Sequence, residues 1–238
     1  MRIDIKTQPD DVTCGPTSLQ AVYRYFNDNI LLEELIPQVN QVATGGTIAV
    51  FLGIHALSRG YDATLYVYNL DVFDPTWFYP RHLSSEELIE KLCAQLAYKP
   101  SWRIREATEA YCEFLKSGGK IQSTDLTPSL LKSYFSQKIP VITGLSATYL
   151  YRCAREVTLS DGESVYDDLQ GVPLGHFVVL CGYDDKNRRI IVADPHKENP
   201  LSHDNYYCVN STRLIHSIML GTLTHDANML IIKPRGKT

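Results

Sequence analysis

A cysteine and the glutamine six positions before it, Cys14 and Gln8, are the residues of this chain with the clearest potential for chemistry. Four apolar residues after the cysteine recur at the spacing of a helix that buries one face: Leu19, Val22, Tyr23 and Phe26. We therefore expect a helix over about residues 14–27, with Cys14 at its N-terminus. The free N–H groups and the positive end of the helix dipole favour a thiolate there, and the thiolate is the nucleophilic form of cysteine. The spacing predicts a reactive thiol, although free cysteines are more commonly small buried hydrophobic residues.

A predicted hairpin near the other end of the chain supplies the partners that such a thiol needs. Apolar strands at 176–183 and 189–194 flank a turn of polar residues. With the turn centred near Asp185, His176 lies opposite Asp194 or within one residue of it. Facing side chains on antiparallel strands have Cβ atoms about 5 Å apart, so a carboxylate can hold an imidazole in position for a thiolate. Separately, a histidine at a strand end and an Asp-Pro turn need no functional explanation. Together with the cysteine and the glutamine they predict a catalytic site.

The same residues resemble the papain-like cysteine peptidases, and within them the C39-like group that is related to bacteriocin-leader processing peptidases. Gln8 and Cys14 match the oxyanion glutamine and the nucleophile of that group. The strand at 175–184 resembles its histidine strand, and Asp194 matches its third catalytic position. The order Gln, Cys, His, Asp spans residues 8–194, which is most of the chain. Leader-processing members are usually fused to a membrane transporter with an ATPase, and because neither is found here, the resemblance does not extend to a leader-peptide substrate.

The resemblance and the chemistry of the side chains give each of the four residues a role. Cys14 attacks a carbonyl carbon, and His176 forms an ion pair with the thiolate and protonates the leaving amine. Asp194 orients His176. The side-chain amide of Gln8 donates to the developing oxyanion together with the backbone N–H of Cys14, and losing one such donor typically costs about 3 kcal/mol of transition-state stabilisation. We interpret His196 as a loop histidine and not as the base.

These roles predict a cysteine peptidase or amidase that hydrolyses a peptide or protein substrate through a thioester on Cys14, without a cofactor. An acyl or peptidyl transferase on the same scaffold, as in phytochelatin synthase-like relatives, is the alternative among enzymes. A catalytically silent peptide-binding module is the alternative outside them. Acylation of an added amine or thiol separates the first two hypotheses. Failure of Cys14 to react with any thiol electrophile in the folded protein would favour the third.

The composition of the chain bears on its core, its binding partners and its location in the cell. With 238 residues, 44% of them hydrophobic and 21% charged, the chain can build a substantial core. A net charge of −4 gives no general attraction to nucleic acids or anionic membranes. We expect a cytoplasmic protein, because there is neither a signal peptide nor an apolar run long enough to span a membrane. The oligomeric state stays open.

The other cysteines and histidines show no metal-binding pattern. Five cysteines fall in helical or strand patterns and are interpreted as core residues with free thiols: Cys93, Cys112, Cys153, Cys181 and Cys208. No pair of cysteines has the C-x-x-C spacing of a structural zinc site, and the histidines share no spacing either. We therefore expect no metal and no cofactor.

The periodicities predict an α+β fold, and the resemblance implies that this fold is papain-like. Helices are expected at 14–27, 31–43, 47–60, 84–98, 101–117, 127–138 and 211–220, and strands at 63–68, 140–145, 176–183, 189–194, 206–210 and 229–233. Ser84, with a glutamate three residues later, is a helix cap. The expected architecture is a single domain over 1–238, with an N-terminal helical lobe at about 1–138 followed by an antiparallel sheet lobe at about 139–238.

Two further regions are candidates for contact with a substrate. Aromatic residues such as Trp77, Tyr149 and Tyr151 could line a cleft between the two lobes, with core packing as the alternative interpretation. The segment at 158–175 is the longest expected loop and contains several acidic residues before His176. Loops of this length are often functional or disordered.

Overall fold

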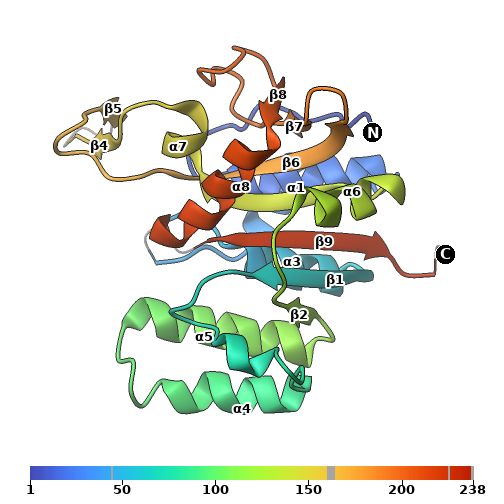
Figure 1. Ribbon diagram of the computed structural model, residues 1–238, viewed down its shortest axis with the longest axis vertical. Helices are drawn as coiled ribbons and strands as arrows, with labels where there is room; N and C mark the ends of the chain where they lie inside the picture. Colours follow the sequence, from blue (N-terminus) through green and yellow to red (C-terminus); the bar gives the residue numbers. More distant parts are fainter. Residues whose placement is uncertain (44, 160–163, 225, 237–238) are drawn as a thin grey trace.

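A seven-stranded mixed β-sheet forms the centre of the protein, whose computed structural model describes residues 1–43, 45–159, 164–224 and 226–236 (Figure 1). From one edge to the other the strands are β2 (Lys120–Gln122), β1 (Tyr61–Val67), β9 (Asn228–Pro234), β3 (Val141–Ser146), β6 (Gly175–Asp184), β7 (Arg189–Ala193) and β8 (Tyr206–Asn210). β1 and β2 run parallel, and the other neighbouring pairs are antiparallel. β3 is buried throughout because helices cover both faces of the sheet at this point.

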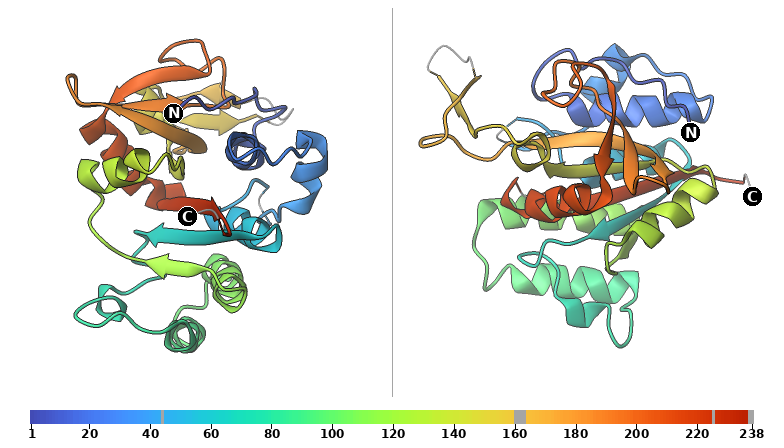
Figure 2. Two further views of the ribbon diagram at one scale, coloured as in Figure 1. Left: turned by 90° about the vertical axis from the view of Figure 1, so that its right-hand side faces the viewer. Right: turned by 45° about the horizontal axis from the view of Figure 1, so that its top comes forward.

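Helices lie on both sides of the sheet, as the left view of Figure 2 shows. On one side are α1 (Cys14–Tyr25) and α3 (Ala49–Ser58), and on the other are α6 (Pro128–Ser136) and α8 (Ser211–Met219). α4 (Ser85–Gln95) and α5 (Trp102–Lys116) pack against each other beyond the β2 edge. The protein is therefore a layered α+β structure, as the sequence predicts.

The side chains of β6 alternate between the two cores. Phe177 and Val179 pack into the core on the α1 side, whereas Val178 and Leu180 pack into the core on the α8 side. Successive side chains of a strand point to opposite faces, so a strand that is apolar at every position fits between two layers of helices. This packing fixes the position of His176, which lies at the start of β6.

Shorter elements complete the fold. They are α2 (Leu32–Leu35), η1 (Ile36–Gln38), η2 (Pro75–Trp77), α7 (Ala147–Tyr151), β4 (Glu156–Thr158), β5 (Ser164–Tyr166) and η3 (Leu220–Thr224). β4 and β5 form a separate antiparallel hairpin that projects from the body near α7 (Figure 1).

Three predictions need correction. The helix expected at 31–43 is only α2 followed by η1, because Pro37 removes a backbone N–H that a longer helix would need. The sheet is not confined to the second half, since β1 from the first half pairs with β9 along its whole length. The expected loop at 158–175 contains β5, while its residues 160–163 lie outside the described residues. Among the described residues no helix is both long and apolar enough to cross a membrane.

Candidate active site

Cys14 is the first residue of α1, as its sequence context predicts. Thr13, the residue before it, does not cap the helix with its side chain, and the first turn contains no acidic residue. The N–H groups at this end are therefore not occupied by a capping side chain, and they favour a negative charge close to them. The thiol is 8% exposed, so it is largely shielded from water but still lines a groove at the surface.

His176 and Asp194 form a buried hydrogen-bonded pair. Nε2 of His176 lies 2.8 Å from Oδ1 of Asp194, although the two residues come from the start of β6 and the end of β7. Asp194 is completely buried and His176 is 7% exposed. Because Nε2 faces the carboxylate, Nδ1 is the nitrogen left for Cys14, which is close enough to contribute to the raised pKa of His176. The imidazole therefore has the carboxylate on one nitrogen and the other nitrogen available to the cysteine.

Four donors saturate the carboxylate of Asp194. Oδ1 also accepts the backbone N–H of His196 at 2.8 Å. Oδ2 accepts the hydroxyls of Tyr151 and Tyr207, each at 2.7 Å. The backbone of Asp194 is held as well, because its N–H donates to the carbonyl of Asn205 and its carbonyl accepts the Asn205 amide. A buried carboxylate with this many donors is stabilised in its ionised form.

The electrostatics of the pair favour a charged histidine. Burial by itself opposes protonation of His176, but the Asp194 carboxylate and the Cys14 sulfur outweigh it and raise the pKa of His176 to about 10. Burial likewise opposes ionisation of Asp194, but His176 and the two tyrosine hydroxyls outweigh it and lower the pKa of Asp194. His176 is therefore an imidazolium at neutral pH, and a positive charge next to the Cys14 sulfur stabilises the thiolate form of a cysteine.

Gln8 is fixed close to this pair through its backbone. Its N–H donates to the carbonyl of Pro195 at 2.9 Å, directly after Asp194 in the chain. Its side-chain Nε2 donates to the carbonyl of Asp10 at 2.8 Å, and Oε1 is buried with no hydrogen-bond partner among the described residues. One amide hydrogen of Gln8 is already used by Asp10, so a role at the oxyanion would require the second hydrogen or a rotation of the side chain. That role stays a prediction.

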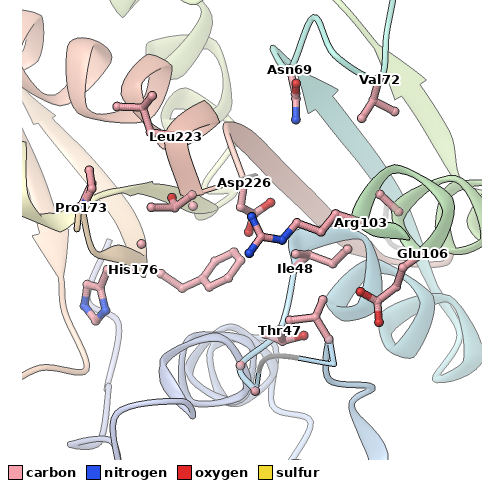
Figure 3. A pocket seen from close by; sticks show the side chains of 18 of the residues that line it. Thr47, Ile48, Asn69, Val72, Arg103, Glu106, Pro173, His176, Leu223 and Asp226 are labelled. Atoms are coloured by element: carbon pink, nitrogen blue, oxygen red, sulfur yellow. The ribbon is translucent and has the colours of Figure 1, made fainter. Parts of the chain in front are cut away.

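A groove of about 650 Å³ extends from Cys14 and His176 between the sheet and α5. Figure 3 shows His176 and Pro173 toward one end, Arg103 and Glu106 toward the other, and Asp226 between them. Asp226 is fully buried, and burial raises its pKa to about 7 despite hydrogen bonds from Asn228 and from the backbone of Ala49. Its volume lies within the range of about 300–1,000 Å³ that is typical of ligand-binding pockets.

The aromatic residues predicted as substrate contacts do not come together. Trp77 packs against the core with an edge-to-face contact to Phe73, at 6.3 Å between ring centroids. Tyr149 is 43% exposed and lines a second cavity. Tyr151 is buried and donates to Asp194, so it positions the carboxylate.

The prediction that the other cysteines lie in the core is wrong for two of them. Cys208 is exposed because it occupies an outward position on the edge strand β8, where burial alternates. Cys93 is exposed on α4, with its sulfur 3.8 Å from that of the buried Cys112. Among the described residues there is no group of three or more His, Cys, Asp or Glu side chains that could hold a metal ion.

The contact between His176 and Asp194 was predicted from a register that the structure corrects. Val179 pairs with Ala193, and an irregularity between Leu180 and Gly182 shifts the pairing by one residue. Continued to the start of β6, this register places position 196 opposite His176. Asp194 reaches the histidine because the chain leaves β7 at this point.

Sequence reasoning missed Tyr207, whereas it placed His196 correctly in a loop without foreseeing that its ring lies beside His176. Tyr207 pairs with Val192 across β7 and β8, so a fully assigned sheet would have placed it near Asp194. The ring centroid of His196 lies 6.3 Å from that of His176. Burial, and to a smaller extent the positive charge of His176, lower the pKa of His196. Its position two residues after Asp194 was the available signal.

Comparison with known proteins agrees with this architecture. The fold is shared with a solved structure described as a C39-like peptidase, and in this chain a helix carries the cysteine and the sheet carries the histidine. More specifically, the chain belongs to the Peptidase_C39 like family, whose model matches residues 2–212. Family membership supports a function of the peptidase type. No curated protein matches the chain.

Three solved structures are similar to this chain at low sequence identity. A protein described as a C39-like peptidase from Bacillus anthracis is 14% identical with a TM-score of 0.50, covering 99% of this chain and 96% of that one. The peptidase domain of Streptococcus ComA, a bi-functional ABC transporter involved in a quorum sensing pathway, is 13% identical with a TM-score of 0.45, covering 98% and 100%. Xylellain, a cysteine protease from Xylella fastidiosa, is 14% identical with a TM-score of 0.37, covering 98% and 87%.

Proposed function

We propose that this protein is a cysteine peptidase or amidase that hydrolyses a peptide or amide bond through a thioester on Cys14. The observation that carries the proposal is the buried, hydrogen-bonded pair of His176 and Asp194, beside Cys14 at the start of a helix, where the charge of Cys14 contributes to the raised pKa of His176. A module that only binds peptides does not require a cysteine beside a buried, hydrogen-bonded pair of histidine and aspartate. Family membership supports the same class of chemistry.

In the first half-reaction, the Cys14 thiolate attacks the carbonyl carbon of the scissile bond. The carbonyl oxygen becomes an oxyanion, to which the backbone N–H of Cys14 and the Gln8 amide are the proposed donors. The tetrahedral intermediate collapses, the C–N bond breaks, and His176 gives its proton to the leaving amine. The acyl group is left on sulfur as a thioester.

In the second half-reaction, water attacks the thioester carbon while neutral His176 accepts a proton from it. The C–S bond breaks, the acid product leaves and the ion pair is restored. Asp194 holds the imidazole in one orientation through both halves, and it stabilises the positive charge each time His176 is protonated.

The direct test compares the wild type with Cys14→Ala on a mixed peptide library and searches for an acyl adduct on Cys14 by mass spectrometry. The wild type should cleave a subset of the peptides, and the variant should cleave none. Cys208→Ala, which removes an exposed cysteine from the edge strand, is the matched control and should keep full activity. Undiminished turnover by Cys14→Ala would end the proposal.

Two added measurements separate the alternatives. A limiting amount of iodoacetamide at neutral pH should label Cys14 before Cys93 and Cys208, although these are more exposed, because reactivity follows the thiolate and not exposure alone. Preferential labelling of either exposed cysteine would count against an activated Cys14. Addition of amines or thiols during turnover should leave hydrolysis as the main outcome. A dominant acylated amine or thiol product would identify a transferase.

A further inference from the structure

A second cavity, of about 580 Å³, lies beside the catalytic groove and carries mainly positive charge. It is formed by α7, the residues after it, the start of α8 and the segment before β6. Its basic lining residues are Arg152, Arg155, Arg213 and His216, and among the described residues no aspartate or glutamate lines it. The chain as a whole has a net charge of −4, so this cavity is a local cluster of positive residues on a negatively charged protein. We call it the arginine pocket.

Two of its guanidinium groups are not engaged by the protein. Neither Arg152 nor Arg213 has a side-chain hydrogen bond or ion pair within the part of the chain that the structure describes. Arg155 is partly occupied, since it donates to the backbone carbonyls of Asp168 and Leu169. The first N–H groups of α8 are already capped by Asn210, so an incoming anion would meet side chains and not the helix end. Planar guanidinium groups of this kind bind carboxylates in two-point contacts.

The arginine pocket and the catalytic groove share a wall. Pro173 and Leu223 line both cavities, and Figure 3 shows these two residues at the end of the groove near His176. Pro173 is three residues before His176 in the chain. Their Cα atoms can therefore be no more than about 10 Å apart, because an extended residue spans at most about 3.3–3.6 Å. A peptide whose scissile bond lies at Cys14 could place a side chain in the arginine pocket about three residues away.

The two cavities differ in charge, which decides where an anionic group would go. The catalytic groove is lined by the acidic residues Asp11, Asp71 and Glu106, by the basic residues Arg103 and His176, and by Asp226, whose pKa is raised to about 7. A carboxylate in this groove would meet like charges, whereas the arginine pocket offers it cations.

We propose that the arginine pocket is a substrate subsite that binds a carboxylate of the peptide about three residues from the scissile bond. This inference rests on the proposed peptidase function, which it extends by naming one determinant of substrate choice. The carboxylate can belong to an aspartate or glutamate side chain or to the C-terminus of a short peptide, and the chemistry of recognition is the same in both cases.

The test measures binding to an inactive protein, so that it does not depend on turnover. Cys14→Ala protein is immobilised and exposed to pools of octapeptides, each with glutamate at one position and uncharged residues at the others. Matched pools carry glutamine in place of glutamate, and bound peptides are quantified by mass spectrometry. Glutamate should be enriched about tenfold or more at one or two adjacent positions, as expected for one charged hydrogen-bonded contact. Pools with free and amidated C-termini show whether the terminal carboxylate can replace the side chain.

The pocket variant Arg152→Gln/Arg213→Gln, also in the Cys14→Ala protein, should lose this enrichment and bind glutamine peptides as before. Lys186→Gln/Arg189→Gln removes two positive charges from the turn at the far end of β6 and is the matched control, which should keep the enrichment. Arg152→Lys/Arg213→Lys retains the charge and should restore part of the enrichment if the Gln variant folds poorly. Equal recovery of glutamate and glutamine pools, or an equal loss in the control variant, would overturn the proposal. If the arginine pocket binds glutamate in this way but the wild type cleaves no peptide, the peptidase assignment is overturned and the binding site for a carboxylate stands.

Discussion

The hydroxyl of Tyr207 lies 2.7 Å from Oδ2 of Asp194, on the carboxylate oxygen that His176 does not contact. The hydroxyl of Tyr151 donates to the same oxygen, so the Asp194 carboxylate is held by two phenols on one side and by His176 on the other. Burial strongly raises the pKa of both tyrosines, and Asp194 raises it further, so they remain neutral donors at any accessible pH. They keep Asp194 ionised without adding charge.

Tyr207→Phe should therefore destabilise the protein and make it more sensitive to acid. A hydrogen bond to a buried charged group contributes about 1.5–3 kcal/mol, and the ring itself is retained. The Asp194 pKa is lowered in the folded state, so its stabilisation is present above the ordinary pKa of 3.8 and is lost as the pH falls through the lowered value. Losing one donor raises that pKa, so acid unfolding should begin at a higher pH.

Urea unfolding at several pH values between 3 and 7 measures both effects. Tyr98→Phe changes a tyrosine that is 86% exposed and should leave the unfolding free energy unchanged at every pH. An acid-unfolding midpoint that is the same in Tyr207→Phe and the wild type would show that this hydroxyl does not hold the charge on Asp194.

Asp194→Asn should lower kcat/KM by about 10²- to 10⁴-fold, the range for a misplaced general acid–base group. The substitution should also change how the reactivity of Cys14 depends on pH. The His176 pKa of about 10 means that the imidazolium persists from low pH up to that value and is lost only as the pH rises through it. Without the carboxylate, burial lowers the pKa of His176, so the imidazolium that stabilises the Cys14 thiolate is lost well below pH 10, and the low-pH limit of Cys14 alkylation should move to higher pH.

The rate of Cys14 alkylation by iodoacetamide as a function of pH measures this limit without a known substrate. Asp125→Asn, which removes an exposed carboxylate, serves as the control and should reproduce the wild-type profile. If the profile of Asp194→Asn also coincides with that of the wild type, the carboxylate is not what keeps His176 protonated.

Local signals in the sequence were sufficient for the elements that carry the catalytic residues. α1 begins at Cys14 because its apolar spacing starts there, and α4 is capped by Ser84 and Glu87 in the predicted box. Strand β8 has the predicted bounds. Each of these features depends on residues a few positions apart.

Long-range features were harder to predict. The register of β6 against β7 depends on an irregularity near Cys181 that no local pattern signals. The pairing of β1 with β9 joins residues more than 160 positions apart, and it brings Asp226 into the groove from the end of the chain. Tyr207 could be found only after β8 had been placed beside β7.

Gly144 on β3 is required by the close approach of Asp226. It pairs with Phe177, next to the catalytic histidine, and a Cβ added to it would lie 2.5 Å from the backbone oxygen of Asp226. Because backbone cannot move aside as a flexible side chain can, Gly144→Ala should lower the unfolding free energy by about 1–3 kcal/mol.

Thermal or urea unfolding tests this, with Gly182→Ala as the control. The Cβ in that variant would lie 3.1 Å from Ile191 Cδ1, the end of a flexible side chain, so the loss should be smaller. Equal losses in the two variants would mean that Asp226 is not held rigidly against β3.

Asp226 should make the wild type less stable as the pH rises from 4 to 8. Burial raises its pKa from 3.8 to about 7, so the folded protein binds a proton that the unfolded chain has already released. A raised pKa contributes stability that is fully present below the unfolded value and is lost as the pH passes through the folded one. A shift of about three units corresponds to a loss on the order of 4 kcal/mol.

Asp226→Asn should abolish that dependence. Asn retains one oxygen to accept the N–H of Ala49, the first residue of α3, so the helix keeps its partner. The variant and the wild type should differ little near pH 4, whereas at pH 8 the variant should be the more stable protein by urea unfolding. Asp71→Asn removes an exposed carboxylate from the same groove and controls for the change in net charge. If the unfolding free energies of the wild type and Asp226→Asn change in parallel from pH 4 to 8, Asp226 is ionised throughout this range. The groove beside Cys14 then carries a fixed negative charge, which would favour a cationic group of the substrate at this point.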